Sequence, residues 1–141
     1  MNKNHNLERF IEAQKTAYEI ALSEIKRGKK QSHWMWYIFP QVFGLGYTGT
    51  SIMYSIKSLD EAAAYLNHEV LGKRLIEISN ALLALETSDA YKVFGSTDNM
   101  KLRSSMTLFS LVPGADKVFQ EVLDKFFDGR EDERTLQLLN A

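Results

Sequence analysis

The chain has 141 residues, of which 45% are hydrophobic, and its 17 basic and 18 acidic side chains give a net charge of −1 at pH 7. This length and composition predict one domain over residues 1–141 with a real hydrophobic core, and they exclude an intrinsically disordered protein. The balanced charge argues against a nucleic acid polymer or an anionic membrane as a partner, and the absence of cysteine excludes disulfides and thiolate catalysis.

The sequence also predicts where the protein resides. Residues 1–6 lack the apolar core of a signal peptide. The chain has no run of about 18 apolar residues that spans a bilayer. We therefore expect a cytoplasmic protein that does not enter a membrane.

Apolar residues recur at helical spacing from Leu7 to Ile25, which predicts a first helix. Asn6 is its expected N-cap, and Gly28 follows its expected C-terminus. Basic side chains occupy four of the five positions in 26–30. We interpret them as cations that complement the helix C-terminus rather than as a nucleic-acid patch.

Segment 32–51 differs from the rest of the chain. It holds both tryptophans, one of the three histidines, one of the two prolines and three of the eight glycines. An aromatic run followed by a glycine-rich turn is poor helix material, so we expect a binding site or an unusual packing role. Periodicity cannot separate helix from strand over so short a run.

The remainder predicts further helices with short connections. Ser58 and Glu61 form a capping-box pattern that opens one of them. No alternating strand pattern with hairpin turns occurs. We therefore predict an all-α orthogonal bundle of about six or seven helices. The predicted helical segments after the aromatic run are 58–66, 68–85, 88–94, 98–111, 117–127 and 132–139.

Two segments resemble the signatures of an uncharacterised bacterial family, domain of unknown function 1810, whose members are sometimes labelled calpastatin-like. They are Ser-His-Trp-Met-Trp-Tyr-Ile-Phe-Pro-Gln at 32–41 and Phe-Gly-Ser-Thr-Asp-Asn-Met-Lys-Leu-Arg-Ser-Ser-Met-Thr-Leu-Phe at 94–109. Leu-Glu-Arg-Phe-Ile-Glu-Ala-Gln at 7–14 and Asp-Glu-Arg-Thr-Leu at 132–136 also fit the family. The resemblance covers almost the whole chain. It implies a mainly helical single domain, and it implies no established catalytic residue.

Residues 44–49, Gly-Leu-Gly-Tyr-Thr-Gly, have the form G-x-G-x-x-G. A dinucleotide-binding fold needs a strand before this motif and a helix after it. Only the helix is predicted, near 50–56, so we assign no Rossmann fold. Two interpretations remain: amides and hydroxyls of the turn bind an anion at a helix start, or the turn only reverses the chain, with Thr50 or Ser51 as N-cap. The candidate anion-binding residues are Gly44, Gly46, Gly49, Thr50 and Ser51.

His33 is the best candidate for an acid, a base or a hydrogen-bond donor, because imidazole changes charge near neutral pH. Trp34 and Trp36 flank it in sequence and are candidates to stack a planar ligand such as a nucleobase. The alternative is that His33 lies beneath an aromatic cluster and that 34–39 is core. Gln41 either reaches a pocket or caps a chain end.

Asp98, Lys101 and Ser105 are separated by three and four residues, so they share one face of the predicted helix 98–111. Lys101 is a candidate to bind phosphate or carboxylate. Serine catalysis needs a base within reach, such as His33, and no G-x-S-x-G turn is present. The alternative is a solvated ion pair with serines tolerated on a helix. The histidine spacing predicts no metal site, and we expect no cofactor.

These candidates support two hypotheses. The first is a pocket that binds a small anionic ligand, such as a nucleotide or an ADP-ribose derivative, with hydrolysis or group transfer by His33 as the reaction to test. The second is a protein-interaction module with no chemistry, in which Trp and Tyr are the anchors. The sequence leaves open whether the protein is an enzyme and what its oligomeric state is. The first hypothesis requires that segment 32–51 and the helix of Lys101 meet in space.

Overall fold

The computed structural model describes residues 5–140, and nine helices make up its regular structure within that range. Six of them have eight or more residues, and the other three have four or five, so the all-α prediction is confirmed. The helices are α1 (Glu8–Lys26), α2 (Met35–Ile38), α3 (Gly49–Met53), α4 (Leu59–Asn67), α5 (Leu71–Leu83), α6 (Ala90–Phe94), α7 (Asp98–Ser110), α8 (Val118–Phe127) and α9 (Glu133–Asn140).

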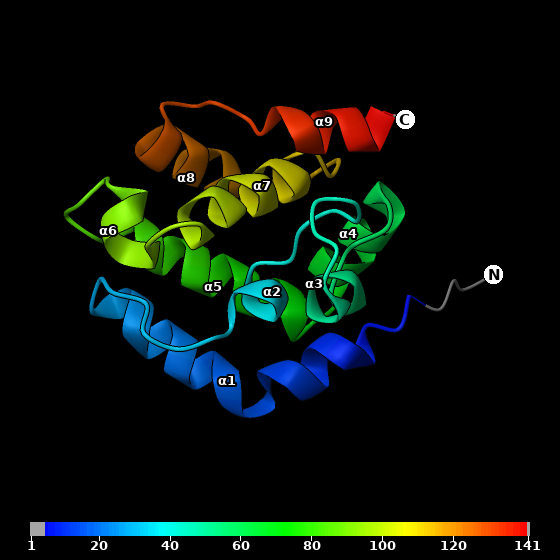
Figure 1. Ribbon diagram of the computed structural model, residues 1–141, viewed down its shortest axis with the longest axis horizontal. Coiled ribbons are helices and arrows are strands. Elements are labelled where there is room, and N and C mark those ends of the chain that lie inside the picture. The colour runs from blue at the N-terminus through cyan, green and yellow to red at the C-terminus, as the bar shows by residue number, and fades with distance from the viewer. Residues whose placement is uncertain (1–4, 141) are drawn as a thin grey trace.

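The helices stack around α5 and α7. In the view of Figure 1, α1 runs along one side of the molecule, α5 crosses the middle, and α7 and α8 lie beyond it, with α9 outermost. α5 packs against α1, α4 and α8, and α7 packs against α4, α6, α8 and α9. The short helix α2 lies next to α1. Because α5 and α7 are covered from several sides, both helices contribute buried faces to the core.

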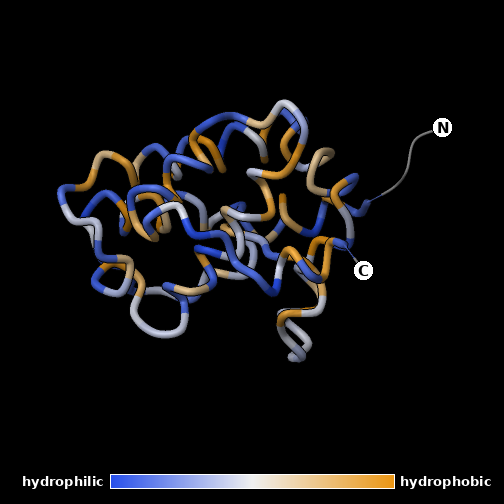
Figure 2. Tube along the Cα trace, turned by 90° about the horizontal axis from the view of Figure 1, so that it is seen from above, coloured by the Kyte–Doolittle hydropathy of each residue, from blue (hydrophilic) through white to orange (hydrophobic). Residues whose placement is uncertain are grey.

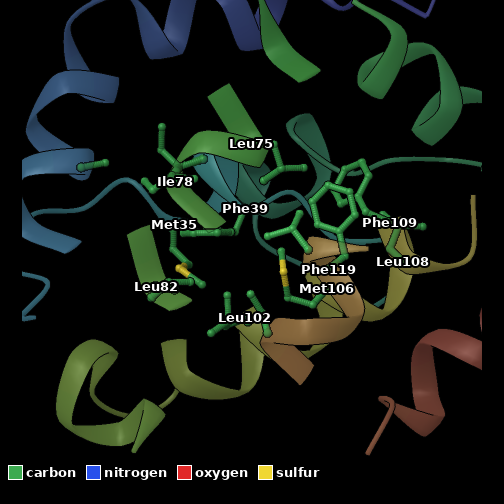
Figure 3. Packing of buried hydrophobic residues seen from close by; sticks show 14 of the residues in the cluster. Met35, Phe39, Leu75, Ile78, Leu82, Leu102, Met106, Leu108, Phe109 and Phe119 are labelled. Carbon is green, nitrogen blue, oxygen red and sulfur yellow. The ribbon is translucent and has the colours of Figure 1, made fainter. Parts of the chain in front are cut away.

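The core is one cluster of buried hydrophobic residues, and the aromatic segment contributes to it. Figure 3 shows Met35 and Phe39 pointing toward the residues of α5, α7 and α8. Orange and blue stretches alternate along the chain in Figure 2, as helices with one buried face require. No helix between residues 5 and 140 is long and apolar enough to cross a bilayer.

Side-chain caps fix several helix starts. Ser58 Oγ accepts a hydrogen bond from the Glu61 amide at 3.1 Å, as the capping-box pattern predicts. α3 begins one residue earlier than the sequence indicated, because Thr48, rather than Thr50 or Ser51, caps it. At the C-terminal end of α1, Gly28 adopts a φ of +79°, the left-handed conformation that favours glycine.

Three other helix starts differ from the sequence prediction. Asn6 does not cap α1: its φ is +52°, the N-cap position falls on Leu7, and no side-chain cap bond is present there. α5 begins at Leu71 rather than near His68, because His68 Nδ1 accepts hydrogen bonds from the amides of residues 70 and 71 and so precedes the helix. α6 begins at Ala90, after its cap Asp89, rather than at position 88, where the predicted segment 88–94 starts.

The α4–α5 corner requires a glycine. A Cβ at Gly72 would lie 2.0 Å from the backbone oxygen of Leu66, far inside van der Waals contact. The two helices can therefore meet this closely only where residue 72 has no side chain.

Candidate functional site

Glu24, near the end of α1, organises the loop that leads into α2. Its Oε1 accepts hydrogen bonds from the amides of Gln31 (2.7 Å) and Ser32 (2.9 Å) and from Trp34 Nε1 (2.9 Å). Its Oε2 accepts one from the Ser32 hydroxyl at 2.5 Å. Burial alone would raise the pKa of this carboxyl group, but the four hydrogen bonds outweigh it and hold the pKa at about 2. Glu24 therefore stays ionised inside the fold and fixes the position of Trp34.

Trp34 belongs to the core. Its side chain is 1% exposed, and its ring centroid lies 6.2 Å from that of Phe39 and 6.4 Å from that of Phe94. The indole N–H is already bonded to Glu24. The ring thus offers no open face to a planar ligand, and of the two tryptophans only Trp36, which is half-buried, borders the surface.

Two lysines and one aspartate form a charged cluster beside these indoles. Lys30 Nζ lies 2.9 Å from Asp98 Oδ2, and Lys101 Nζ lies 2.9 Å from Asp98 Oδ1. Lys30 Nζ is 5.0 Å from the centroid of the Trp34 ring, and Lys101 Nζ is 4.3 Å from that of Trp36. Segment 32–51 and α7 therefore meet at this cluster, as the ligand hypothesis requires.

Asp98 is held as an anion by its two neighbours. Burial raises the pKa of this carboxyl group. The hydrogen bonds from Lys30 and Lys101 and their positive charges lower the pKa by more than burial raises it, so the pKa lies below its ordinary value. The carboxylate thus neutralises one ammonium charge at neutral pH.

The glycine turn closes onto α3 and leaves little space. Trp36, Gln41, Gly44, Gly46 and Ser51 line a cavity of about 10 Å³, enough for about one water molecule. A Cβ at Gly46 would lie 2.8 Å from the Ser51 side chain. Gln41 is 6% exposed, and its Nε2 has no hydrogen-bond partner among residues 5–140. The cavity has both polar and apolar walls and is too small for a nucleotide.

The polar groups at the start of α3 form hydrogen bonds with one another. Thr48 Oγ1 accepts a hydrogen bond from the Ser51 amide at 3.1 Å, and the Ser51 hydroxyl donates to the Thr48 carbonyl at 2.9 Å. Gly49 and Thr50 are exposed on the first turn. The turn-reversal interpretation accounts for these contacts without a ligand.

His33 and Ser105 lie in opposite environments. His33 is exposed, and its carbonyl accepts a hydrogen bond from the Tyr37 hydroxyl at 3.0 Å. Ser105 is fully buried, although it follows Lys101 by one helical turn, because α7 is covered on several sides at this point. A solvent-borne substrate therefore has no access to the Ser105 hydroxyl. No group of three or more metal-binding side chains is found in the part of the chain that the structure describes.

The comparisons with known proteins agree with this fold. A family model described as "Protein of unknown function (DUF1810)" matches residues 4–139. The chain belongs to this family. It is also similar to a solved structure, the crystal structure of the conserved hypothetical protein Rv1873 from Mycobacterium tuberculosis at 1.38 Å, with 40% sequence identity, a TM-score of 0.95 and 99% of each chain covered. The comparison with curated proteins gives no significant match.

In this DUF1810 domain, the family segment at residues 7–14 contributes to a buried ion pair. Arg9 Nη2 lies 2.7 Å from Glu61 Oε2, with the two side chains 7% and 3% exposed. Arg9 also donates to the backbone carbonyls of residues 5, 6, 53 and 55. The sequence alone does not reveal this pair, because its members are 52 positions apart. The signature residue Arg9 therefore joins α1 to the α3–α4 connection.

The signature at 94–109 anchors the chain at residues 130–132, where the family segment 132–136 begins. Arg103 donates to the carbonyls of Arg130 (3.0 Å) and Glu131 (2.7 Å). Thr107 Oγ1 accepts from the Asp132 amide at 2.9 Å, and Asp132 caps α9 through Thr135. These contacts give two family segments a structural role that needs no ligand.

Proposed function

We propose that this domain binds a small anionic ligand at the cluster of Lys30, Asp98 and Lys101. The observation that carries the proposal is that two ammonium groups share one carboxylate. Among residues 5–140 neither lysine has another ion-pair partner, so the cluster has a net charge of +1. The three side chains are only 8%, 20% and 24% exposed, and charges withdrawn from solvent are screened less by salt.

An anion at this cluster restores charge balance. Lys101 is the more accessible of the two lysines, and the Trp36 ring under its ammonium group holds it at the surface. Its point charge suits a phosphate group. A nucleotide or an ADP-ribose derivative combines such a group with a planar ring, and that ring matches Trp36, the indole beside Lys101 that borders the surface. If the ligand is a substrate, we assign proton transfer to His33, which is exposed and close to Lys30 in sequence. Binding at this cluster does not require the closed glycine turn at 44–49.

Thermal-shift measurements test the proposal with ADP and ADP-ribose, and with adenosine as the uncharged control. A ligand that binds only the folded state stabilises it by about 2.7 kcal/mol at a hundredfold excess over Kd. We expect Lys101→Met to fold but to lose the shift. The exposed Lys73→Met is the matched control and is expected to keep it. No shift with either anion, or an equal shift in Lys101→Met, contradicts the proposal.

A second candidate function, a protein-interaction module, is favoured by an exposed apolar surface. Four of the seven exposed large hydrophobic side chains among the described residues lie between positions 43 and 53, with exposed fractions of 42–81%. Aromatic and methionine side chains are enriched at protein interfaces. The residues are Phe43, Tyr47, Ile52 and Met53.

Pull-down from a lysate of the source organism tests this function with the wild type and with a Tyr47→Ser, Met53→Ser variant. A specific partner that the variant loses supports an interaction module. The same set of captured proteins for both chains opposes it.

A further inference from the structure

A hollow lined by three lysines lies next to the charged cluster of Lys30, Asp98 and Lys101. Lys29, Lys30 and Lys92 line it together with Tyr91, and its volume is about 370 Å³. Its walls come from the loop after α1 and from α6, which the Lys30 amide joins by a 2.7 Å hydrogen bond to the Val93 carbonyl. No acidic side chain is among the residues that line it. The volume falls within the range of small-molecule sites, about 300–1,000 Å³.

The basic residues after α1 do more than complement a helix terminus. α1 ends at Lys26, so Lys29 and Lys30 lie beyond its last turn. Lys92 comes from a segment about sixty residues away and has no relation to that helix end. Lys30 is paired with Asp98, but no ion pair of Lys29 or Lys92 is found among residues 5–140. Positive charges gathered from two segments repel one another, and an anion between Lys29 and Lys92 relieves that repulsion.

Tyr91 adds an aromatic surface to the same hollow. Its side chain is 62% exposed, which leaves its ring open to solvent. An exposed aromatic ring beside cations matches a ligand that joins a planar base to phosphate groups, because a base stacks on the ring while its phosphates meet the ammonium groups.

We infer that this hollow binds the phosphate chain and the base of a nucleoside diphosphate. The inference rests on the function proposed above, because Lys30 belongs both to the hollow and to the cluster with Asp98 and Lys101. A ligand with two phosphate groups places one in the hollow, near Lys29 and Lys92. The other lies near Lys30, within reach of Lys101. Tyr91 holds the base.

Isothermal titration calorimetry with ADP, AMP and pyrophosphate tests the inference. We expect ADP to bind about tenfold more tightly than AMP, because it makes further charged contacts. Lys92→Met is expected to remove most of that preference. Tyr91→Ala is expected to weaken ADP about fivefold or more without changing pyrophosphate binding, and Tyr91→Phe to behave as the wild type. Lys73→Met is the control.

The outcomes separate this inference from the proposed function. If Lys101→Met weakens ADP binding while Lys92→Met and Tyr91→Ala do not, the hollow is not the site and the cluster proposal stands. If only the hollow variants weaken binding, the hollow is supported and the role of Lys101 is refuted. Wild type that does not bind ADP overturns this inference, and wild type that binds neither ADP nor ADP-ribose overturns both. Tighter binding of a single-stranded oligonucleotide than of ADP, lost in Lys92→Met, overturns the assignment of a small ligand.

Discussion

Replacing Glu24 with glutamine changes the side chain that binds residues 31–34, and it keeps the size of that side chain. The amide removes a negative charge that four donors share, three from the loop backbone and hydroxyl and one from the Trp34 indole. It also turns one oxygen acceptor into a donor that faces other donors. The protein should therefore lose stability, and the loss should depend on pH.

The magnitude follows from the pKa of Glu24. Folding lowers it from an ordinary value of 4.5 to about 2. Because the folded-state pKa is depressed, the ionised group stabilises the fold above the unfolded pKa, and this stabilisation is lost as the pH falls through the folded pKa. A difference of about 2.5 pKa units corresponds to roughly 3 kcal/mol at pH 7. The contribution falls to about 1.5 kcal/mol at pH 3.

Urea unfolding followed by tryptophan fluorescence measures this effect. The free energies of unfolding of the wild type and of Glu24→Gln should differ by about 3 kcal/mol at pH 7, and the difference should shrink by about half at pH 3. Glu19→Gln is the matched control on the same helix, where Glu19 is exposed, and should change stability by less than about 0.5 kcal/mol. Equal destabilisation by Glu24→Gln at both pH values would refute the electrostatic account of this carboxylate.

Other predictions concern the packing that positions the site, and urea unfolding measures each. Arg9→Met should cost about 3–5 kcal/mol, because it leaves the buried Glu61 carboxylate without its cation; adding Glu61→Gln should recover part of this, and full additivity would argue against the pair. Gly72→Ala should lower the free energy of unfolding by about 3 kcal/mol or more, because the new Cβ would lie 2.0 Å from a backbone oxygen. Gly49→Ala should cost nothing, because no atom lies within 4 Å of a Cβ at that position. Similar losses for the two variants would contradict the close-approach argument. Trp34→Ala should cost about 3–5 kcal/mol, and a loss below about 1 kcal/mol would contradict its core position.

The helices could be predicted because their signals are local. The apolar spacing in 7–25, the stop at Gly28 and the Ser58 cap all act within one or two turns, and each is present in the structure. The position of His68 could not be predicted in the same way. A histidine that accepts a hydrogen bond before a helix and a histidine inside a helix are the same residue type in the sequence. The resemblance to the DUF1810 family was also available from the sequence and is confirmed.

The site could be predicted only in part, because it depends on contacts between distant segments. The pairing of Lys101 with Asp98 follows from their spacing, but the second lysine of the cluster, Lys30, lies 68 positions from Asp98, and only the fold shows it. Glu24 looks like an ordinary surface charge in the sequence. One signal could have indicated its burial: Glu24 follows Ala21 by three residues and so lies on the same, buried face of α1.

The two tryptophans show why residue type alone did not define a pocket. Trp34 and Trp36 are two positions apart, so they face different directions at the start of a short helix. One enters the core beneath Glu24, and the other borders the surface under Lys101. Ser105 and Lys101 share a helix face by spacing, yet only Lys101 reaches solvent, because the coverage of α7 changes along its length.

NMR titration of the ¹⁵N-labelled protein with ADP tests the central claim most directly, since the chain's two indole N–H groups report on separate environments. We expect the Trp36 indole signal and the backbone amides of 29–33 and 91–101 to shift. The Trp34 indole signal should stay unchanged, because its N–H remains bonded to Glu24 inside the core. Shifts confined to residues 43–53, or no shift at saturating ADP, would contradict anion binding at the lysine cluster.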